Sequence, residues 1–456
     1  MYLTHKLLLS FFIIGFNSFA YAEKSDSLQK VINKYRFNKS EFSIGVLNLK
    51  DNQLVGLHNE RKLFNSASLA KIITTYIGLK ELGPDFSWQS DFYYTGDIVG
   101  ETLKGDIIFK GTGDASFSVE DLEGMIRRIQ RKGINRIEGN LLFDSTYFGE
   151  IPNGVTFDND PMRAYNVLPS AISVQSNTIN FRFNSKKNKV KIEATPNIKA
   201  LKIVNNVKTT REKCLSWREK LIYETKANEQ QNSLIFRGKF SKKCKVKEID
   251  LAMLDWQTYF YHTFKQKWLD NGGWFNGNFI DTSGTLDDDR LLVSHYSEPL
   301  SSLIRDTNKY SLNLMSRNLI LTVIANKNNV QPTEEMVNPY IKNWLSKNKI
   351  DNEGLFIDNG AGLSRDIKIS INQLLMILQN IYYDPMMPEI ISSFPIAGID
   401  GTLKKRMKNS PIRMNGHFKT GSMNEVSAIA GFFLNNDKEM NIFVFMMNGK
   451  KANMSQ

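Results

Sequence analysis

The stretch Asn65–Tyr76 constrains the fold most, because it places a reactive pair at the start of a helix. Two short strands are predicted before it, over residues 42–49 and 54–58, and apolar side chains at helical spacing follow it. Ser68 and Lys71 are therefore three residues apart on one helical face. A serine hydroxyl is a poor nucleophile unless a base lies within hydrogen-bond reach. Lys71 can be that base if burial or nearby cations lower the pKa of its ammonium group.

Two further motifs lie downstream of this pair. Ser311-Leu312-Asn313 falls in a region predicted to be helical, and Lys419-Thr420-Gly421-Ser422 falls on a predicted strand near the C-terminus. Each short motif can arise by chance. All three in this order, each in its expected element, predict a serine acyltransferase that is inhibited by penicillin.

The catalytic steps can be divided among four of these residues. Ser68 attacks an acyl carbonyl and forms an acyl-enzyme, and Lys71 takes its proton. Ser311 passes a proton to the leaving amine, and Asn313 offers its amide to the substrate backbone. This scheme requires no cofactor and no metal.

The third motif is expected to bind substrate. Lys419 and Thr420 can hold a terminal carboxylate through a charge-assisted hydrogen bond. Gly421 has no Cβ, so a substrate strand can lie close to it. The backbone N–H groups of Ser68 and Ser422 would form the oxyanion hole.

At this point the chain resembles class C low-molecular-mass penicillin-binding proteins, the D-alanyl-D-alanine carboxypeptidases and endopeptidases. The resemblance extends beyond the three motifs over nearly the whole chain after residue 22. Shared segments are Gly111–Ala115 (with Ala115 where the family has Pro), Gly139–Asp144, Asp358–Arg365, Phe394–Leu403 and a long insertion from about Trp88 to Asp270.

The resemblance implies an α/β (α+β) fold. Its core would be a penicillin-binding transpeptidase-like domain, in which helices cover a five-stranded antiparallel sheet, with two nested β-rich inserted domains. The expected divisions are residues 1–22 as signal peptide, 23–87 and 271–456 as catalytic domain, 88–183 and 248–270 as inserted domain II, and 184–247 as nested domain III.

The resemblance also implies a function. The chain would be a serine-type DD-peptidase, a hydrolase that cleaves D-alanyl-D-alanine or D-amino-acid cross-link bonds in peptidoglycan stem peptides, with β-lactams as covalent inhibitors. The balance of carboxypeptidase and endopeptidase action stays open. Two alternatives are an inactive peptidoglycan-binding scaffold of the same fold and a β-lactamase. The intact motifs speak against the scaffold, and the long insertion speaks against the lactamase.

Asp144 and Arg365 match positions that form a side-chain pocket in relatives. An aspartate that holds an ammonium and an arginine that holds a carboxylate would suit the zwitterionic end of diaminopimelate. The alternative for each residue is a structural ion pair or cap.

The N-terminus predicts export. A mostly apolar run from Leu7 to Phe19 precedes Ala20-Tyr21-Ala22, which is typical of a signal-peptide cleavage site; a retained membrane anchor is the alternative. A short amphipathic helix is predicted over Asp26–Phe37. The expected location is the periplasm, with peripheral membrane association left open. Cys214 and Cys244 are the two cysteines, and in that compartment they are expected to form a disulfide rather than remain free thiols.

The positive charge of the chain is concentrated in one region. Residues 184–247 contain eighteen Lys plus Arg and five Glu, a net charge of +13, whereas the whole chain carries +12. One reading is a surface that meets an anionic cell-wall polymer, and the other is a solvated insertion. Nucleic acid is not an expected partner, because the chain is exported and no aromatic side chains interleave the lysines.

Overall fold

The computed structural model describes residues 38–152, 158, 160–186, 188–227, 232–282, 284 and 290–454. The expected signal peptide and the expected helix over residues 26–37 lie outside this part of the chain. None of the helices in the described part is long and apolar enough to cross a membrane.

The catalytic domain is built on a five-stranded antiparallel sheet, as the sequence predicted. Its strand order is β18-β19-β20-β1-β2. The first two strands and the last three of the chain thus share one sheet: β1 (Phe42–Asn48), β2 (Leu54–His58), β18 (Gly416–Met423), β19 (Val426–Leu434) and β20 (Met440–Asn448). Strand β19 is buried without interruption over Val426–Phe432, so both of its faces are covered, and most residues of β20 are buried as well.

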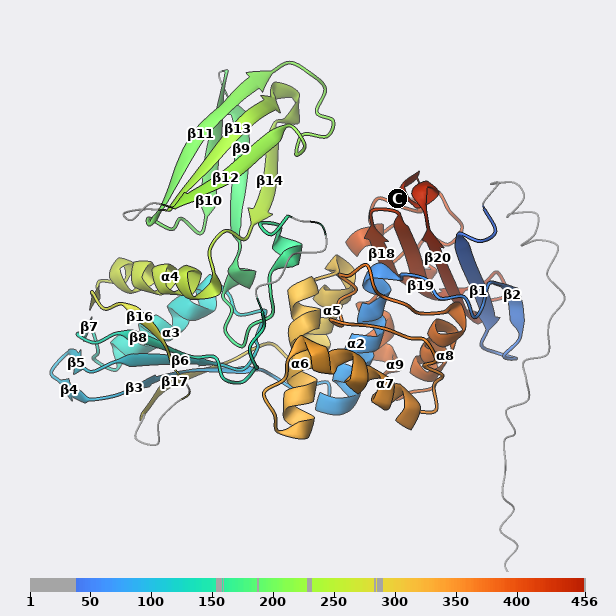
Figure 1. The fold of residues 1–456 in the computed structure, drawn as a ribbon, viewed down its shortest axis with the longest axis horizontal. Helices are drawn as coiled ribbons and strands as arrows, with labels where there is room; N and C mark the ends of the chain where they lie inside the picture. The colour runs from blue at the N-terminus through green and yellow to red at the C-terminus, as the bar shows by residue number, and fades with distance from the viewer. Residues whose placement is uncertain are drawn as a thin grey trace, which may run out of the picture.

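Helices fill the rest of this domain (Figure 1). They are α2 (Ala70–Leu82), α5 (Leu300–Tyr310), α6 (Asn313–Asn328), α7 (Val337–Lys347), α8 (Ile371–Tyr382) and α9 (Met387–Ser393). Helix α8 lies close against β1, where a Cβ on Gly45 would be 2.6 Å from Cγ2 of Ile371. Helix α2 is buried along Ala70–Leu79, because it packs against both α5 and α6. This burial fixes the helix that carries Lys71.

Domain II contains two mixed sheets and two helices. The larger sheet has the order β16-β8-β6-β3-β17, and the smaller has the order β15-β7-β5-β4. Helices α3 (Val119–Arg131) and α4 (Trp256–Asp270) pack against each other, and α3 begins with a capping box between Ser118 and Asp121. The strands are β3 (Gln89–Tyr94), β4 (Asp97–Val99), β5 (Thr102–Lys104), β6 (Ile107–Gly111), β7 (Arg136–Ile137), β8 (Leu141–Asp144), β15 (Trp274–Phe275), β16 (Phe279–Thr282) and β17 (Arg290–Tyr296).

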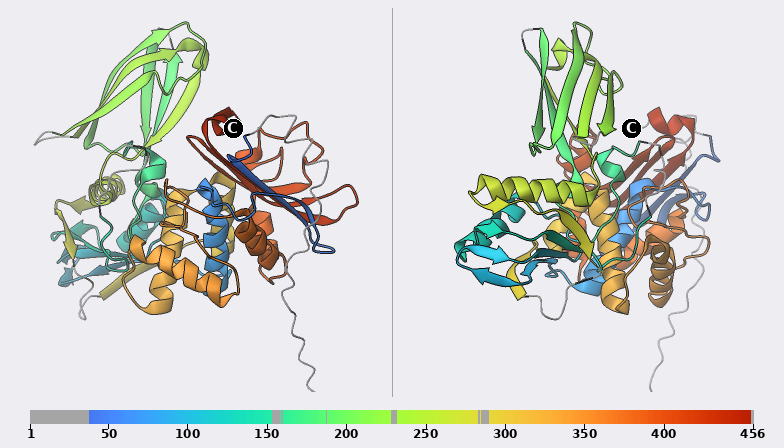
Figure 2. Two further views of the ribbon diagram at one scale, coloured as in Figure 1. Left: turned by 45° about the vertical axis from the view of Figure 1, so that its right-hand side comes forward. Right: turned by 60° about the vertical axis from the view of Figure 1, so that its left-hand side comes forward.

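Domain III is a sandwich of two three-stranded sheets, β10-β9-β14 and β11-β13-β12. Its strands are β9 (Ile179–Lys186), β10 (Lys189–Thr195), β11 (Leu201–Thr210), β12 (Leu221–Ala227), β13 (Asn232–Ser241) and β14 (Val246–Leu251). Phe181 and Phe183 of one sheet meet Phe236 of the other at ring-centroid distances of 5.1 and 5.2 Å. The domain stands on domain II and projects upward from it in both views (Figure 2).

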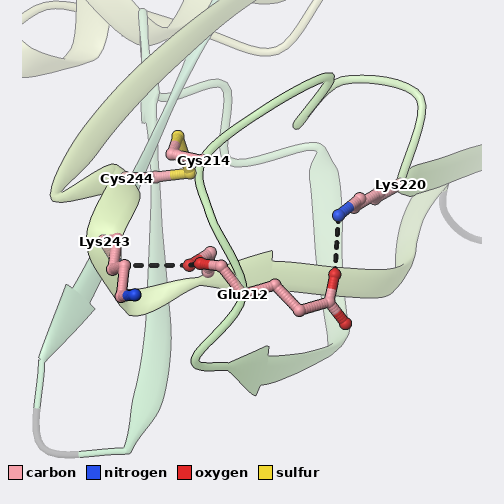
Figure 3. The surroundings of a disulfide bond; sticks show 6 residues. Glu212, Cys214, Lys220, Lys243 and Cys244 are labelled. Atoms are coloured by element: carbon pink, nitrogen blue, oxygen red, sulfur yellow. Dashed lines mark hydrogen bonds and ion pairs between the residues drawn. A yellow bond between two sulfur atoms is a disulfide. The ribbon is translucent and has the colours of Figure 1, made fainter.

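A disulfide lies at the outer end of domain III (Figure 3). It joins Cys214, in the segment between β11 and β12, to Cys244, which follows β13; their Cα atoms are 4.9 Å apart. The bond therefore ties the segment after β11 to the end of a neighbouring strand.

The strand pairing places the domain boundaries at residues that differ from those expected from the sequence. Domain III runs from Ile179 to Leu251 rather than over 184–247, because β9 and β14 pair along their whole length. Strands β16 and β17 extend the large sheet of domain II as far as Tyr296. The catalytic domain therefore resumes near Ser297 and not at residue 271. Strand β16 has only four residues and no clear alternation, so its sequence does not reveal it.

Candidate active site

Ser68 lies in a short 3-10 turn, Ala67–Leu69, that leads into α2. Ala67 just before it has a φ of 45°, a left-handed conformation that costs energy for a residue with a side chain. Two glycines allow other segments to approach this turn. A Cβ on Gly421 would lie 2.4 Å from the carbonyl oxygen of Ser66, and a Cβ on Gly362 would lie 2.0 Å from that of Ala67. The strained turn is thus held between β18 and the segment that contains Gly362.

Lys71 is fully buried and its Nζ faces the hydroxyl of Ser68 at 3.0 Å. The same Nζ donates to Oδ1 of Asn313 at 2.7 Å and to the carbonyl oxygen of Ala361. Burial, and then the charge of Lys419, hold the pKa of Lys71 well below its ordinary value. As a neutral amine, Lys71 would give two N–H groups to these fixed acceptors and direct its lone pair at Ser68.

Ser311 and Lys419 form a second hydroxyl–amine pair. Nζ of Lys419 lies 3.0 Å from Oγ of Ser311 and 2.7 Å from the carbonyl oxygen of Thr420. Ser311 ends α5 in a left-handed conformation, with φ 60° and ψ 45°, which turns its side chain out of the helix. Burial lowers the pKa of Lys419 to about 7. This lysine can therefore lose or regain its proton near neutral pH.

Asn313 joins the catalytic domain to domain II. Its Oδ1 accepts from Lys71, and its Nδ2 donates to the carbonyl oxygen of Tyr165 at 3.1 Å. Two other side chains of α6 make similar bonds one turn further on. They are Arg317, whose Nη1 donates to the carbonyl of Val167 at 2.9 Å, and Asn318, whose Nδ2 donates to the carbonyl of Ser170 at 3.0 Å.

A partly buried ion pair supports the end of α5. Nζ of Lys309 lies 2.6 Å from Oδ2 of Asp400 and 3.0 Å from the carbonyl oxygen of Phe394. Thr402 lies two residues after Asp400, and its hydroxyl is 2.8 Å from the hydroxyl of Thr420. The segment 394–403 therefore touches both the helix end that presents Ser311 and the strand that presents Thr420.

Apart from Arg365, the sequence analysis had identified the segments 358–365 and 394–403 only as features shared with the family. The contacts of these segments with the three motifs could not be predicted from the sequence, because several of the groups involved are backbone carbonyls or belong to residues distant in the sequence. Ala361 acts through its carbonyl oxygen on Lys71, and Tyr165 acts likewise on Asn313. Thr402 contributes a hydroxyl, but a lone threonine gives no signal in a sequence.

Asp144 and Arg365 have different surroundings. Asp144 ends β8 and is 1% exposed; its Oδ2 lies 3.1 Å from Nζ of Lys110, and its Oδ1 accepts from the hydroxyl of Thr146 at 2.6 Å. These hydrogen bonds and the charge of Lys110 lower the pKa of the Asp144 carboxyl, although burial opposes them as the largest single effect. Arg365 is exposed, and its Nη1 donates to the carbonyl oxygen of Asn424 at 2.6 Å.

The described residues contain no group of three or more His, Cys, Asp or Glu side chains that could hold a metal. The groups gathered around Ser68 are instead hydroxyls, amines and one amide. A nucleophile beside a buried amine, with a second hydroxyl–amine pair supplied by other elements, is an arrangement suited to acyl transfer.

Comparison with known proteins agrees with this geometry. D-alanyl-D-alanine carboxypeptidase DacB of Haemophilus influenzae is 25% identical over 410 residues, covering 88% of this chain and 84% of that protein. Penicillin-sensitive carboxypeptidase A of Dictyostelium discoideum is 25% identical over 412 residues, covering 84% and 78%. The crystal structure of penicillin binding protein 4 from H. influenzae superposes with a TM-score of 0.78 at 22% identity, covering 90% of each chain.

The model of one peptidase family matches residues 24–456, which include every motif described above. The chain belongs to the D-Ala-D-Ala carboxypeptidase 3 (S13) family.

Proposed function

We propose that this protein is a serine DD-peptidase of peptidoglycan that works through an acyl-enzyme on Ser68. The observation that carries the proposal is the contact of 3.0 Å between the Ser68 hydroxyl and the buried Lys71 amine, whose pKa is lowered. Membership of a D-Ala-D-Ala carboxypeptidase family supports the substrate class.

The reaction follows from these contacts. Neutral Lys71 takes the Ser68 proton as Oγ bonds to the carbonyl carbon of the penultimate D-alanine. Ser311 gives its proton to the leaving amine and takes one back from protonated Lys419, 3.0 Å away, while the N–H groups of Ser68 and Ser422 hold the oxyanion. Lys419 and Thr420 hold the terminal carboxylate, whose charge would favour the protonated form of Lys419. Water then releases the acyl group. A β-lactam would acylate the same hydroxyl.

The two alternatives are less well supported. Among the described residues, the hydrogen-bond partners of Ser68, Lys71, Ser311 and Lys419 include no carboxylate that could activate a deacylating water. This argues against a β-lactamase. A scaffold without activity would not need two buried amines whose pKa values are lowered, because such groups cost stability.

Digestion of purified muropeptides, with products identified by mass, tests the function directly. We expect loss of a terminal D-alanine, cleavage of D-amino-acid cross-links, or both, and we expect a labelled penicillin to attach to Ser68. Ser68→Ala should abolish cleavage and labelling. Cleavage that persists in Ser68→Ala would refute the assignment, and rapid turnover of a β-lactam without peptide cleavage would favour the lactamase.

We also propose that Arg365 selects substrates by binding the carboxylate at the diaminopimelate end of the stem peptide. Its exposed guanidinium suits this role. Asp144 was expected to act with it, but the burial of Asp144 and its bond to Lys110 favour the structural alternative for that residue. Arg365→Ala should weaken cleavage of diaminopimelate peptides about tenfold and leave peptides without that terminus unaffected. An equal loss on both would make Arg365 structural.

The periplasm is the compartment we propose, because the substrate class and the expected signal peptide both point there. The net charge of +13 over residues 184–247 supports a second contact with an anionic component of the cell envelope, for which a cell-wall polymer was the expectation.

A further inference from the structure

The positive charge of domain III is concentrated at one end. We define the distal tip as residues 208–220 and 239–245, which comprise the last three residues of β11 and of β13 and the segments that lead from them to β12 and β14. It contains nine lysines and arginines and two glutamates: Lys208, Arg211, Lys213, Arg218, Lys220, Lys239, Lys242, Lys243, Lys245, Glu212 and Glu219. Strands of ten residues span roughly 33 Å, so β11 and β13 hold this tip far from the junction between domains III and II (Figure 1).

Most of these cations are unpaired within the described residues. Lys220 lies 2.6 Å from Glu212 (Figure 3), whereas Lys208, Arg211, Lys213, Lys239, Lys243 and Lys245 form no ion pair there. Lys208 is the direct neighbour of Lys239 in the sheet, and the backbone N–H of Lys239 bonds the carbonyl of Lys220. Lys208 and Lys239 thus lie side by side on neighbouring strands, and Lys220, which directly precedes β12, continues the row beyond Lys239. Like charges in this position destabilise a sheet, so the row favours a partner with negative charge.

A leucine lies among these cations. Leu215 has 67% of its surface exposed, more than any other large apolar residue in the described chain. Its loop is fixed on both sides. The Cys214–Cys244 disulfide holds it before Leu215, and Trp217 packs against Phe240 at a centroid distance of 5.9 Å after it. The apolar side chain is therefore presented by an anchored loop.

We propose that the distal tip docks on an anionic lipid surface. Lysines and arginines near such a surface are attracted by its potential, and an apolar side chain adds a second signal by entering the headgroup boundary. A soluble anionic polymer would use the charges but would gain little from Leu215, and the aromatic side chains described in domain III are either buried or, for Trp217 and Tyr223, half-buried.

Co-sedimentation with vesicles tests this proposal. The chain is used without residues 1–22, since an apolar signal peptide would bind lipid itself. We expect binding to vesicles that contain phosphatidylglycerol, strong weakening by salt, and little binding to phosphatidylcholine alone. Lys243→Gln with Lys245→Gln should weaken binding about tenfold or more, since each cation contributes about fivefold.

The controls separate the tip from charge in general. Lys202→Gln with Lys226→Gln removes the same charge from two exposed lysines that form no ion pair with any described residue, at the end of the same domain nearest domain II, and should have a much smaller effect. Leu215→Ser should weaken vesicle binding about fivefold or more. Leu291→Ser, at a leucine of domain II that is 53% exposed, should not. Thermal unfolding checks that each variant is folded.

Three results would overturn the proposal. The first is equal weakening by the two lysine pairs, and the second is no effect of Leu215→Ser. The third is binding to soluble polyglutamate or polyphosphate as tight as to vesicles and insensitive to Leu215→Ser, which would assign the tip to an anionic polymer. None of these assays measures peptide cleavage, so the outcome is independent of the proposed function.

Discussion

Lysines occur in two opposite settings in this protein. Lys71 and Lys419 are fully buried next to hydroxyl groups, and burial lowers the pKa of both. The lysines of the distal tip are mostly exposed to solvent. The comparison shows that the same side chain serves as a base when it is removed from water and as a fixed positive charge when it stays in water.

The two settings also differ in what supports them. The buried amines depend on contacts from several elements, such as the carbonyl of Ala361 and the amide of Asn313 around Lys71. The tip depends on one disulfide and on strand pairing. Loss of one partner should therefore affect chemistry in the first region and mainly stability or adhesion in the second.

The largest contrast should come from removing one lysine of each kind. Lys71→Ala is expected to slow acylation by a labelled penicillin at least about a hundredfold, the usual scale for the loss of a general base. Lys202→Ala, at an exposed lysine of domain III, should leave the rate unchanged. Rates of labelling measured on both variants give the answer, and a normal rate in Lys71→Ala would remove this lysine from the mechanism.

The disulfide gives the second contrast. Replacing Cys214 and Cys244 together by serine should lower the free energy of unfolding of domain III by about 2–4 kcal/mol. Acylation should change little, because the bond lies in a different domain from Ser68. Denaturant unfolding and penicillin labelling of the same sample test both statements. A large loss of acylation with no loss of stability would contradict this division.

The pH dependence of the free energy of unfolding should also reflect the lowered pKa values of the two buried lysines, Lys71 and Lys419. Lys419 has a pKa of about 7 when folded and an ordinary value of 10.5 when exposed. Between these pH values the unfolded chain binds a proton that the folded chain has lost, so the free energy of unfolding should rise with pH, by up to about 1.4 kcal/mol per pH unit. Lys419→Met should reduce this slope. The slope that remains in this variant should come from Lys71, whose pKa is also lowered by burial. Denaturant melts from pH 7 to 10 measure it; an unchanged slope would mean that Lys419 is not desolvated.

The smallest effect concerns the hydroxyl pair of Thr402 and Thr420. If Thr402 donates to Thr420, the Thr420 proton is free to meet the terminal carboxylate of a substrate. Thr402→Val should raise KM about fivefold for peptides with a free terminal carboxylate, with kcat little changed, and Thr402→Ser should restore it. Peptides with an amidated terminus serve as the control. Equal losses on both peptides would assign Thr402 a purely structural role.

The sequence predicted the fold class because its signals are local. The spacing of Ser68 and Lys71 at a helix start, the two further motifs and the family resemblance that they support were sufficient to predict the five-stranded antiparallel sheet. Domain boundaries were less accurate, because β9 and β14 continue across them and β16 is short.

The sequence predicted which motifs form the candidate site, but it did not predict the hydrogen bonds that connect them to other segments. Lys71, Ser311 and Lys419 were named from their residue types, and the structure brings them together. The carbonyl of Tyr165 and the hydroxyl of Thr402 were missed, because a backbone group and a single threonine look like any other in a sequence. The burial of Asp144 is likewise a property of packing.

The bonds between α6 and domain II have an evolutionary consequence. They occupy side-chain donors of Asn313, Arg317 and Asn318 with carbonyl groups of the inserted segment. A gene that lost this insertion in one step would remove partners of two buried side chains, Arg317 and Asn318, and of the half-buried Asn313 amide, and each donor that stayed buried without a partner would cost about 1–3 kcal/mol. The insertion and the core must therefore have changed together, and an exchange of insertions between relatives would succeed only where these carbonyls are reproduced.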